Sequence, residues 1–149
     1  MISNHSYHSP FTNYKSWQVG QILDIDLMKK VAGVLIGEHD FSAFRSSNCN
    51  SPNTVKAIRE ISICKSHFQN SILQIEIEAN SFLQHMVRII TGTLGEAALA
   101  RINCADVKKA LKNGDRKLAG CTAPAHGLYS LKVIYPEGLV SWPSEVIDN

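Results

Sequence analysis

The feature that most constrains the fold is an alternating segment at residues 71–79, Ser-Ile-Leu-Gln-Ile-Glu-Ile-Glu-Ala. Apolar residues occupy every second position from Leu73 to Ala79, and polar residues occupy the positions between them. A period of two is typical of a β-strand with one buried face and one solvated face. Strands of this kind belong to antiparallel sheets whose second face stays in water. We therefore expect a sheet that other elements cover on one face only.

The same alternation recurs in two other segments. Residues 55–65 form a second expected strand, because isoleucines alternate there with polar or small side chains. A turn at residues 67–70 joins these two strands into an expected hairpin. Residues 128–135 alternate as well and stop at Pro136, which predicts a final strand. Residues 38–52, ahead of the hairpin, are expected to form a compact loop.

Three segments have the apolar spacing of helices. The expected helices cover residues 24–36, 82–99 and 103–113, with Asp24 or Asp26 capping the first and Asn103 the third. The first has one apolar face, made of Met28, Val31, Ala32 and Leu35. The resulting order, α-β-β-α-α-β with a hairpin at its centre, predicts an α+β fold with a largely antiparallel sheet and helices on one face.

The domain organisation expected from composition is simple. Residues 1–22 are rich in Ser, Asn, His and Tyr and are expected to form an irregular or edge segment. Residues 23–137 form the expected folded domain, and residues 138–149 a loosely held tail. A chain of 149 residues is long enough for one domain with a moderate core.

Several classes of protein are disfavoured by the sequence. No apolar run approaches the roughly 20 residues needed to cross a bilayer, and residues 1–20 lack the pattern of a secretory signal. The four cysteines form no Cys-x-x-Cys pair and the six histidines no His-x-x-x-His pattern, so we expect no metal site. Reduced thiols and the absence of a signal predict a cytoplasmic location without a membrane partner.

The net charge of +2 neither requires nor excludes a nucleic acid as partner. Its distribution is more informative, since residues 101–117 contain six basic and two acidic residues, a local excess of four. The basic residues are Arg101, Lys108, Lys109, Lys112, Arg116 and Lys117. Two interpretations remain open for them, a solvated helix face and a surface that contacts RNA phosphates.

Arg88 is the most unusual charge in the chain. It lies in an apolar helical segment, Met-Val-Arg-Ile-Ile, so no orientation of that helix leaves its guanidinium wholly in water. The residues three and four positions away include no acid. A buried charge without a partner is costly, so a counterion is expected from elsewhere in the fold, from another chain or from a ligand. Gly92 and Gly95 lie on the same helix side and indicate either tight packing or the floor of a site.

Three segments resemble one known family. Residues 39–45 (His-Asp-Phe-Ser-Ala-Phe-Arg), 79–92 (Ala-Asn-Ser-Phe-Leu-Gln-His-Met-Val-Arg-Ile-Ile-Thr-Gly) and 122–129 (Thr-Ala-Pro-Ala-His-Gly-Leu-Tyr) resemble, in order and spacing, the C-terminal half of the TruA-type tRNA pseudouridine synthases. The resemblance extends from residue 9 to residue 137. One departure is important, because the family's Arg-Thr-Asp-Ala-Gly-Val-His motif, which carries the catalytic aspartate, does not occur here.

The resemblance implies isomerisation of uridine to pseudouridine in the tRNA anticodon stem-loop, at the positions conventionally called 38 to 40. It implies tRNA as the partner, no metal or organic cofactor, half of the pseudouridine synthase fold and a homodimer. Because the chain resembles only the half without the aspartate, it is expected to be truncated and inactive alone. With half of the fold's sheet missing, self-association of the fragment is also expected.

The resemblance also assigns roles to individual residues. Arg88 matches the active-site arginine that pairs with the catalytic aspartate. Leu128 matches the apolar residue that packs against the target uracil, although an ordinary core leucine is an equally good interpretation of the sequence alone. His85 and Arg45 are candidates for contacts with phosphate or ribose, with a structural role as the alternative for His85, and Gly92 is a candidate for the substrate site.

Two other hypotheses remain open. The chain could be a non-catalytic RNA-binding module that kept the shape of the synthase and lost its chemistry. It could also be an unrelated α+β domain that binds a small molecule or a protein. Sequence upstream of Met1 would separate the first alternative from the enzyme.

Overall fold

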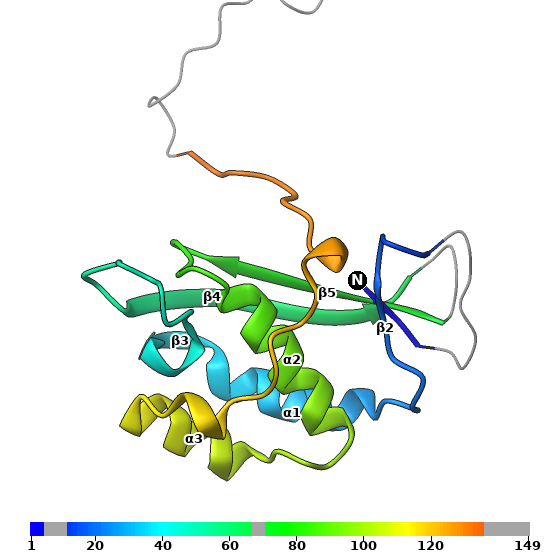
Figure 1. Ribbon diagram of the computed structural model, residues 1–149, viewed down its shortest axis with the longest axis horizontal. Coiled ribbons are helices and arrows are strands. Elements are labelled where there is room, and N and C mark those ends of the chain that lie inside the picture. The colour runs from blue at the N-terminus through cyan, green and yellow to red at the C-terminus, as the bar shows by residue number, and fades with distance from the viewer. Residues whose placement is uncertain (5–11, 67–70, 136–149) are drawn as a thin grey trace, which may run out of the picture.

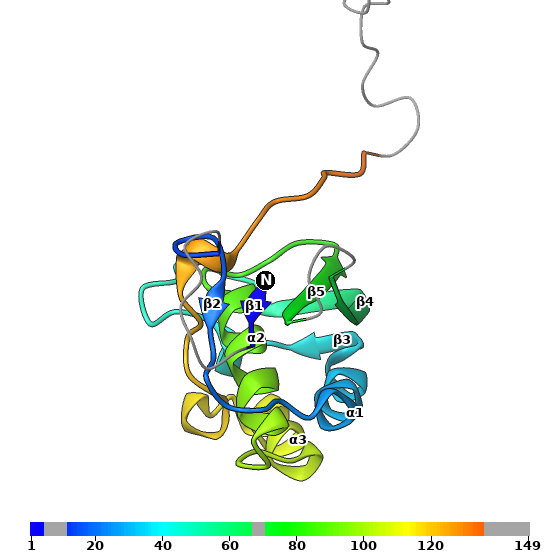
Figure 2. The same ribbon diagram turned by 90° about the vertical axis from the view of Figure 1, so that its right-hand side faces the viewer.

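The computed structural model describes residues 1–4, 12–66 and 71–135. Over these residues the chain forms one five-stranded sheet with the order β2-β1-β5-β4-β3, and its helices lie on one side of it (Figures 1 and 2). The strands are β1 Ile2–Ser3, β2 Trp17–Gln18, β3 Gly37–Asp40, β4 Val55–Lys65 and β5 Ile72–Ala79. All pairings are antiparallel except that of β1 with β2. The predicted α+β fold with a largely antiparallel sheet is therefore confirmed.

The central hairpin follows from the alternation of the sequence. β4 and β5 pair antiparallel, with Ile61 opposite Ile77 and Ile63 opposite Ile75. Cross-strand neighbours share a face, so the side chains of these four isoleucines point toward the helices. The glutamates of β5 lie on the opposite face of the sheet. The predicted hairpin strands are confirmed. The turn expected at residues 67–70 lies outside the described residues, as does the tail at 138–149.

The helices are α1 Ile25–Leu35, α2 Met86–Ala98 and α3 Cys104–Asn113. Asp24, rather than Asp26, caps α1, since its carboxylate accepts hydrogen bonds from the first-turn amides. Asn103 caps α3 in a capping box with Asp106, and Gly114 ends α3 at a φ of +66°. The predicted apolar face of α1 is buried against α2 and the sheet, which confirms that prediction. None of the helices in the described part is long and apolar enough to span a membrane.

α2 begins at Met86 and not at Phe82, so the prediction of a helix from residue 82 is wrong at its N-terminal end. The reason is His85, whose φ of +63° is left-handed and cannot continue a right-handed helix backwards. Residues 81–85 instead form a turn that buries Leu83 and leaves Phe82 exposed.

Three short strands were not predicted individually: β3 lies in the expected loop, and β1 and β2 lie in the segment expected to be irregular or at an edge. The loop predicted from residue 38 begins with β3, which pairs with β4 from Gly37 opposite Ile58 to Asp40 opposite Val55. The N-terminal segment contributes β1 and β2 to the sheet, with β2 at its edge. These strands are two to four residues long, too short to show an alternation in the sequence.

Residues 128–135 form no strand, so the prediction of a final strand is wrong. The segment is exposed along its length and leads away from the body of the molecule, as the orange trace in Figure 1 shows. An alternating sequence forms a ladder only where a neighbouring strand offers free backbone groups, and no described strand lies beside these residues. Residues 128–135 thus have the alternation of a strand, but none of the described strands pairs with them.

Candidate functional site

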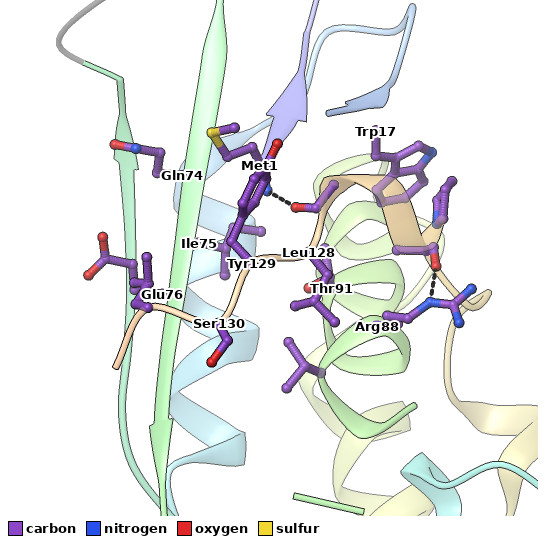
Figure 3. A pocket seen from close by; sticks show the side chains of 15 residues that line it. Met1, Trp17, Gln74, Ile75, Glu76, Arg88, Thr91, Leu128, Tyr129 and Ser130 are labelled. Atoms are coloured by element: carbon purple, nitrogen blue, oxygen red, sulfur yellow. Dashed lines mark hydrogen bonds between the residues drawn. The ribbon is translucent and has the colours of Figure 1, made fainter. Parts of the chain in front are cut away.

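A pocket of about 360 Å³ opens between β5, α2 and residues 123–131. Figure 3 shows Gln74 and Glu76 on its β5 side, Met1 near its centre and Thr91 and Arg88 on α2 at its other side. The pocket thus brings together Arg88 and Leu128, two residues singled out from the sequence. They are 40 positions apart in the chain and meet because residues 119–123 pack along α2.

Arg88 is half-buried and is bound to residue 123 twice. Its Nε donates to the carbonyl oxygen of Ala123 at 2.7 Å, and the amide of Ala123 donates to the carbonyl oxygen of Arg88 at 3.1 Å. In Figure 3 the guanidinium points away from β5. This arrangement fixes the side chain, and no hydrogen bond to its two terminal nitrogens is found among the described residues.

No carboxylate within the described ranges pairs with Arg88. The ion pairs found there are Arg59 with Glu78 and Arg101 with Glu96. A carbonyl oxygen satisfies one donor but does not neutralise a positive charge, so the half-buried guanidinium retains an affinity for an anion. Of the three sources of a counterion considered from the sequence, an acid within this part of the fold is therefore excluded.

The backbone that holds Arg88 is itself braced by Arg116 and Thr93. One terminal nitrogen of Arg116 donates to the carbonyl of Gly120 at 2.7 Å, and the hydroxyl of Thr93 accepts from the amide of Gly120 at 2.9 Å. The other terminal nitrogen of Arg116 contacts the hydroxyl of Thr122 at 3.3 Å. Sequence reasoning missed these bracing roles, because the partners lie in a segment without regular secondary structure.

Gly92 and Gly95 allow close approach of other parts of the chain. A Cβ at Gly92 would lie 1.9 Å from the carbonyl oxygen of Cys121, and one at Gly95 would lie 2.9 Å from the indole of Trp17. Both distances are shorter than van der Waals contact. The packing interpretation therefore accounts for both glycines, since Gly92 lies against the backbone of Cys121 and Gly95 against the indole of Trp17 on β2. A contact between Gly92 and substrate stays a prediction.

Leu128 lines the pocket with 49% of its surface exposed. The segment before it is held against the N-terminal part of the chain, because the amine of Met1 donates to the carbonyl of Gly127 at 2.7 Å. The hydroxyl of Tyr129 donates to the carbonyl of Lys15 at 2.9 Å. In this structure Leu128 is an accessible apolar side chain and not a core leucine, and its contact with a uracil stays a prediction.

His85 and Arg45 lie outside this pocket but near each other in the fold. The amide of Ser46, next to Arg45, donates to the carbonyl of Gln84, next to His85, at 3.0 Å. His85 is exposed and Arg45 is half-buried. The two loops therefore form a common surface at the N-terminal end of α2, where the predicted contacts with phosphate or ribose remain untested.

The predicted basic surface separates into two kinds of residue. Lys108, Lys109, Lys112 and Lys117 are exposed and form no ion pair in the described part of the chain. Arg101 contacts Glu96 and Gln21, and Arg116 is used inside the fold. Lys108, Lys109 and Lys112 lie on α3 and Lys117 lies in the short turn that follows it. In Figure 1 the orange end of the chain lies at the other end of α2 from α3. A tRNA that contacts both these lysines and the pocket at Leu128 would have to span the surface between them.

Removing two of these lysines tests the phosphate interpretation. Lys109→Ala with Lys112→Ala should weaken binding of the chain to tRNA and reduce the slope of log K against log salt by about 1.5–2, since each phosphate contact releases nearly one counterion. Filter binding between low and moderate salt measures the slope. Lys29→Ala with Lys30→Ala on α1 is the matched control, because both lysines are exposed. An equal change in the two double variants would show that only net charge matters.

No group of three or more His, Cys, Asp or Glu that could hold a metal ion is found among the described residues. Burial raises the pKa of the Cys121 thiol, which lies beside Gly92. A raised pKa keeps this thiol protonated at neutral pH, so it is a poor nucleophile. Neither observation provides a second chemical centre near Arg88.

Comparison with known proteins gives one consistent family. The family model described as tRNA pseudouridine synthase matches residues 31–136. The chain is 42% identical over 135 residues to the tRNA pseudouridine synthase A of Thermoanaerobacter sp. (strain X514), with 91% of this chain and 54% of the relative covered.

Two more distant relatives carry the same name. The protein of Geobacter sp. (strain M21) is 38% identical over 130 residues, with 87% of this chain and 51% of the relative covered. That of Acetivibrio thermocellus is 36% identical over 135 residues, with 91% and 54% covered. The chain spans about half the length of the curated relatives it matches. With a family match across most of its residues and an α+β half-domain as its fold, this chain belongs to the tRNA pseudouridine synthase family.

Proposed function

We propose that this chain is the arginine-bearing half of an enzyme that isomerises uridine to pseudouridine in the tRNA anticodon stem-loop, at positions 38 to 40. In this proposal, Arg88 forms an ion pair with a catalytic aspartate supplied by the part of the synthase that these 149 residues do not cover. The half-buried guanidinium, with a carbonyl as its described partner, is the observation that carries the proposal. Without that aspartate, the chain alone has no activity.

The reaction requires an ionised and oriented carboxylate, and the guanidinium of Arg88 can hold one in that state. Isomerisation breaks the bond between C1′ and N1 of uridine, turns the uracil and forms a bond between C1′ and C5. N1 gains a proton and C5 loses one, so nothing is consumed and no cofactor is required. An ionised, oriented carboxylate can start this sequence, and an adjacent guanidinium keeps a carboxylate ionised and aimed. The nitrogens of Arg88 that do not contact Ala123 are suited to that pairing.

Leu128 has a complementary role in the proposal. The uracil must turn between bond cleavage and bond formation, and fixed hydrogen bonds to its edge would resist that turn. A flat apolar contact does not, and Leu128 offers an exposed apolar side chain in the same pocket as Arg88. The target nucleotide must leave its stack to reach such a site.

Complementation tests the proposed function. The chain is mixed with the part of the Thermoanaerobacter relative that it does not cover, and pseudouridine is measured in an unmodified tRNA transcript. Neither polypeptide alone should form pseudouridine, and the mixture should. Turnover by the chain alone would contradict the need for an external aspartate. A complex that binds tRNA without any turnover would instead support the non-catalytic RNA-binding module.

The resemblance also leads us to propose that the complete synthase is a homodimer and acts in the cytoplasm. The four cysteines are free thiols, which supports a reducing compartment. Sedimentation of the complemented enzyme measures its subunit number, and a stable complex with one copy of each half would contradict the dimer.

A further inference from the structure

Residues 12–16 form a tight turn ahead of β2. The carbonyl oxygen of Thr12 accepts hydrogen bonds from the amides of Lys15 and Ser16 and from the hydroxyl of Ser16, each at 3.1 Å. Thr12 and Ser16 are buried, whereas the residues between them are exposed. The turn therefore has a fixed base from which the side chains of Tyr14 and Lys15 extend into solvent.

Two hydrogen bonds hold this turn against the segment that contains Leu128. Nε2 of His126 lies 3.0 Å from the carbonyl oxygen of Ser16, which can only accept, so this nitrogen carries a hydrogen. The hydroxyl of Tyr129 donates to the carbonyl of Lys15 at 2.9 Å. In Figure 2 the orange part of the chain lies beside the blue N-terminal strands. Because Leu128 and Tyr129 line the pocket, the turn lies at the rim of the candidate site.

Tyr14 is the unusual residue of this turn. Its φ of +57° is left-handed, a conformation that is unfavourable for a bulky side chain and that glycine adopts without cost. Tyr14 is also 79% exposed, so burial of its ring does not offset the strain. Strained residues of this kind are concentrated at functional sites. The strain and the exposure together indicate that the ring of Tyr14 is kept for binding and not for folding.

The ring of Tyr14 contacts the ring of His126 edge to face. Their centroids are 6.3 Å apart and their planes lie at 76°. In such a pair the edge of one ring covers one face of the other, so Tyr14 keeps at least one face open whichever ring supplies the edge. His126 precedes Leu128 by two residues, which span at most about 7 Å. The open face is therefore close enough to Leu128 for a nucleotide next to a base that is bound there.

We propose that the open face of Tyr14 stacks on an unpaired base of the tRNA substrate, the base next to the target uridine, and that Lys15 contacts a phosphate beside it. This inference rests on the proposed function. A uridine that leaves its stack exposes its neighbours, and aromatic side chains bind exposed bases by stacking. Lys15 forms no ion pair within the ranges that the structure describes. Because every base has a flat face, such a contact tolerates any base at that position.

A cycle that combines ring removal with base removal tests this contact. The RNA is an anticodon stem-loop that is either intact or abasic at one of the two nucleotides that flank the target uridine. Tyr14→Gly removes the ring and suits the left-handed backbone, and Tyr14→Phe keeps the ring. Filter binding measures the Kd of the unsubstituted chain and of each variant for each RNA, so the cycle isolates the ring–base contact.

The intact RNA should bind Tyr14→Gly about tenfold more weakly than the unsubstituted chain, and Tyr14→Phe within about twofold. Removing the stacked base should weaken binding to the unsubstituted chain by about tenfold, and Tyr14→Gly should add no further loss. Equal losses on the intact RNA and on both abasic RNAs would overturn the proposal, because Tyr14 would then only shape the surface. The absence of any loss in Tyr14→Gly would also overturn it.

Thermal unfolding separates a binding role of Tyr14 from a structural one. The unfolding midpoint of Tyr14→Gly should stay within about 3 °C of that of the unsubstituted chain, since relief of strain offsets the flexibility of glycine. A larger fall would make the ring part of the fold and contradict the proposal. Tyr135→Ala is the matched control, because Tyr135 is exposed in the segment that leads away from the molecule, and it should leave every Kd unchanged.

The outcome is distinguishable from that of the complementation experiment, because the cycle measures binding and involves no turnover. Pseudouridine formation without coupling between Tyr14 and a flanking base would leave the proposed function intact and overturn the stacking contact. Coupling without any pseudouridine formation would support the contact in a non-catalytic RNA-binding module.

Discussion

Replacing Arg88 by alanine is expected to abolish most of the turnover of the complemented synthase while tRNA binding stays within about threefold. The proposed ion pair orients and keeps ionised the carboxylate that starts the reaction, and losing one such charge-stabilising group costs about 10²–10³-fold in kcat. In the proposed function other parts of the surface hold the tRNA, so Kd should change little. Single-turnover kinetics gives the rate, and filter binding gives the Kd.

Arg88→Lys separates charge from geometry. Lysine keeps the positive charge but has no Nε–H in the position that contacts Ala123 and no planar fork for a carboxylate. Its turnover should fall nearly as far as that of the alanine variant. Full activity of Arg88→Lys would show that a point charge suffices.

Arg59→Ala is the matched control for both substitutions. Arg59 is exposed and pairs with Glu78 on the hairpin, so its loss should leave turnover unchanged. Equal losses of kcat and of tRNA affinity in Arg88→Ala would instead mean that Arg88 only docks the RNA. Circular dichroism of each variant shows whether α2 and the sheet are intact.

The parts of the fold that could be predicted from the sequence are those with a local signal. The hairpin of β4 and β5 has a period of two over many residues, and its polar face rules out burial on both sides. α3 carries its own cap at Asn103 and its own stop at Gly114. Both signals are short-range, so no knowledge of the rest of the chain is needed.

The parts that could not be predicted depend on distant segments. The start of α2 is set by the left-handed His85, in a turn whose Gln84 carbonyl is bound by Ser46 from another loop. The alternation of residues 128–135 is strand-like, but a ladder also requires a neighbour, which a sequence pattern cannot supply.

In the candidate site too, features with a local sequence signal were predictable and contacts between distant segments were not. The burial of Arg88 follows from its helical neighbours and was predictable. Its contact with Ala123, 35 residues away, was not, because that contact depends on how residues 119–123 cross α2. The glycines of α2 indicated a close approach but not which backbone makes it.

Gly92→Ala is the second substitution with a large expected effect. The added Cβ would lie 1.9 Å from the carbonyl oxygen of Cys121 and 2.8 Å from its carbonyl carbon. Both are backbone atoms, which cannot rotate away, so the crossing segment must move as a unit. Overpacking against backbone costs about 3 kcal/mol, well above the propensity gain of roughly 1 kcal/mol from replacing a helical glycine by alanine. Urea unfolding followed by circular dichroism measures the change in the free energy of unfolding.

Gly33→Ala should change the free energy of unfolding in the opposite direction in the same experiment. Gly33 lies within α1, and a Cβ there would meet nothing within 4 Å. The same substitution should therefore stabilise the chain by about 0.5–1 kcal/mol, because only the helix propensity changes. If both variants were stabilised, the crossing segment would be free to move away from α2 at little cost. The carbonyl of Ala123 could then not hold Arg88 in one orientation, and the geometric basis of the proposed ion pair would be lost.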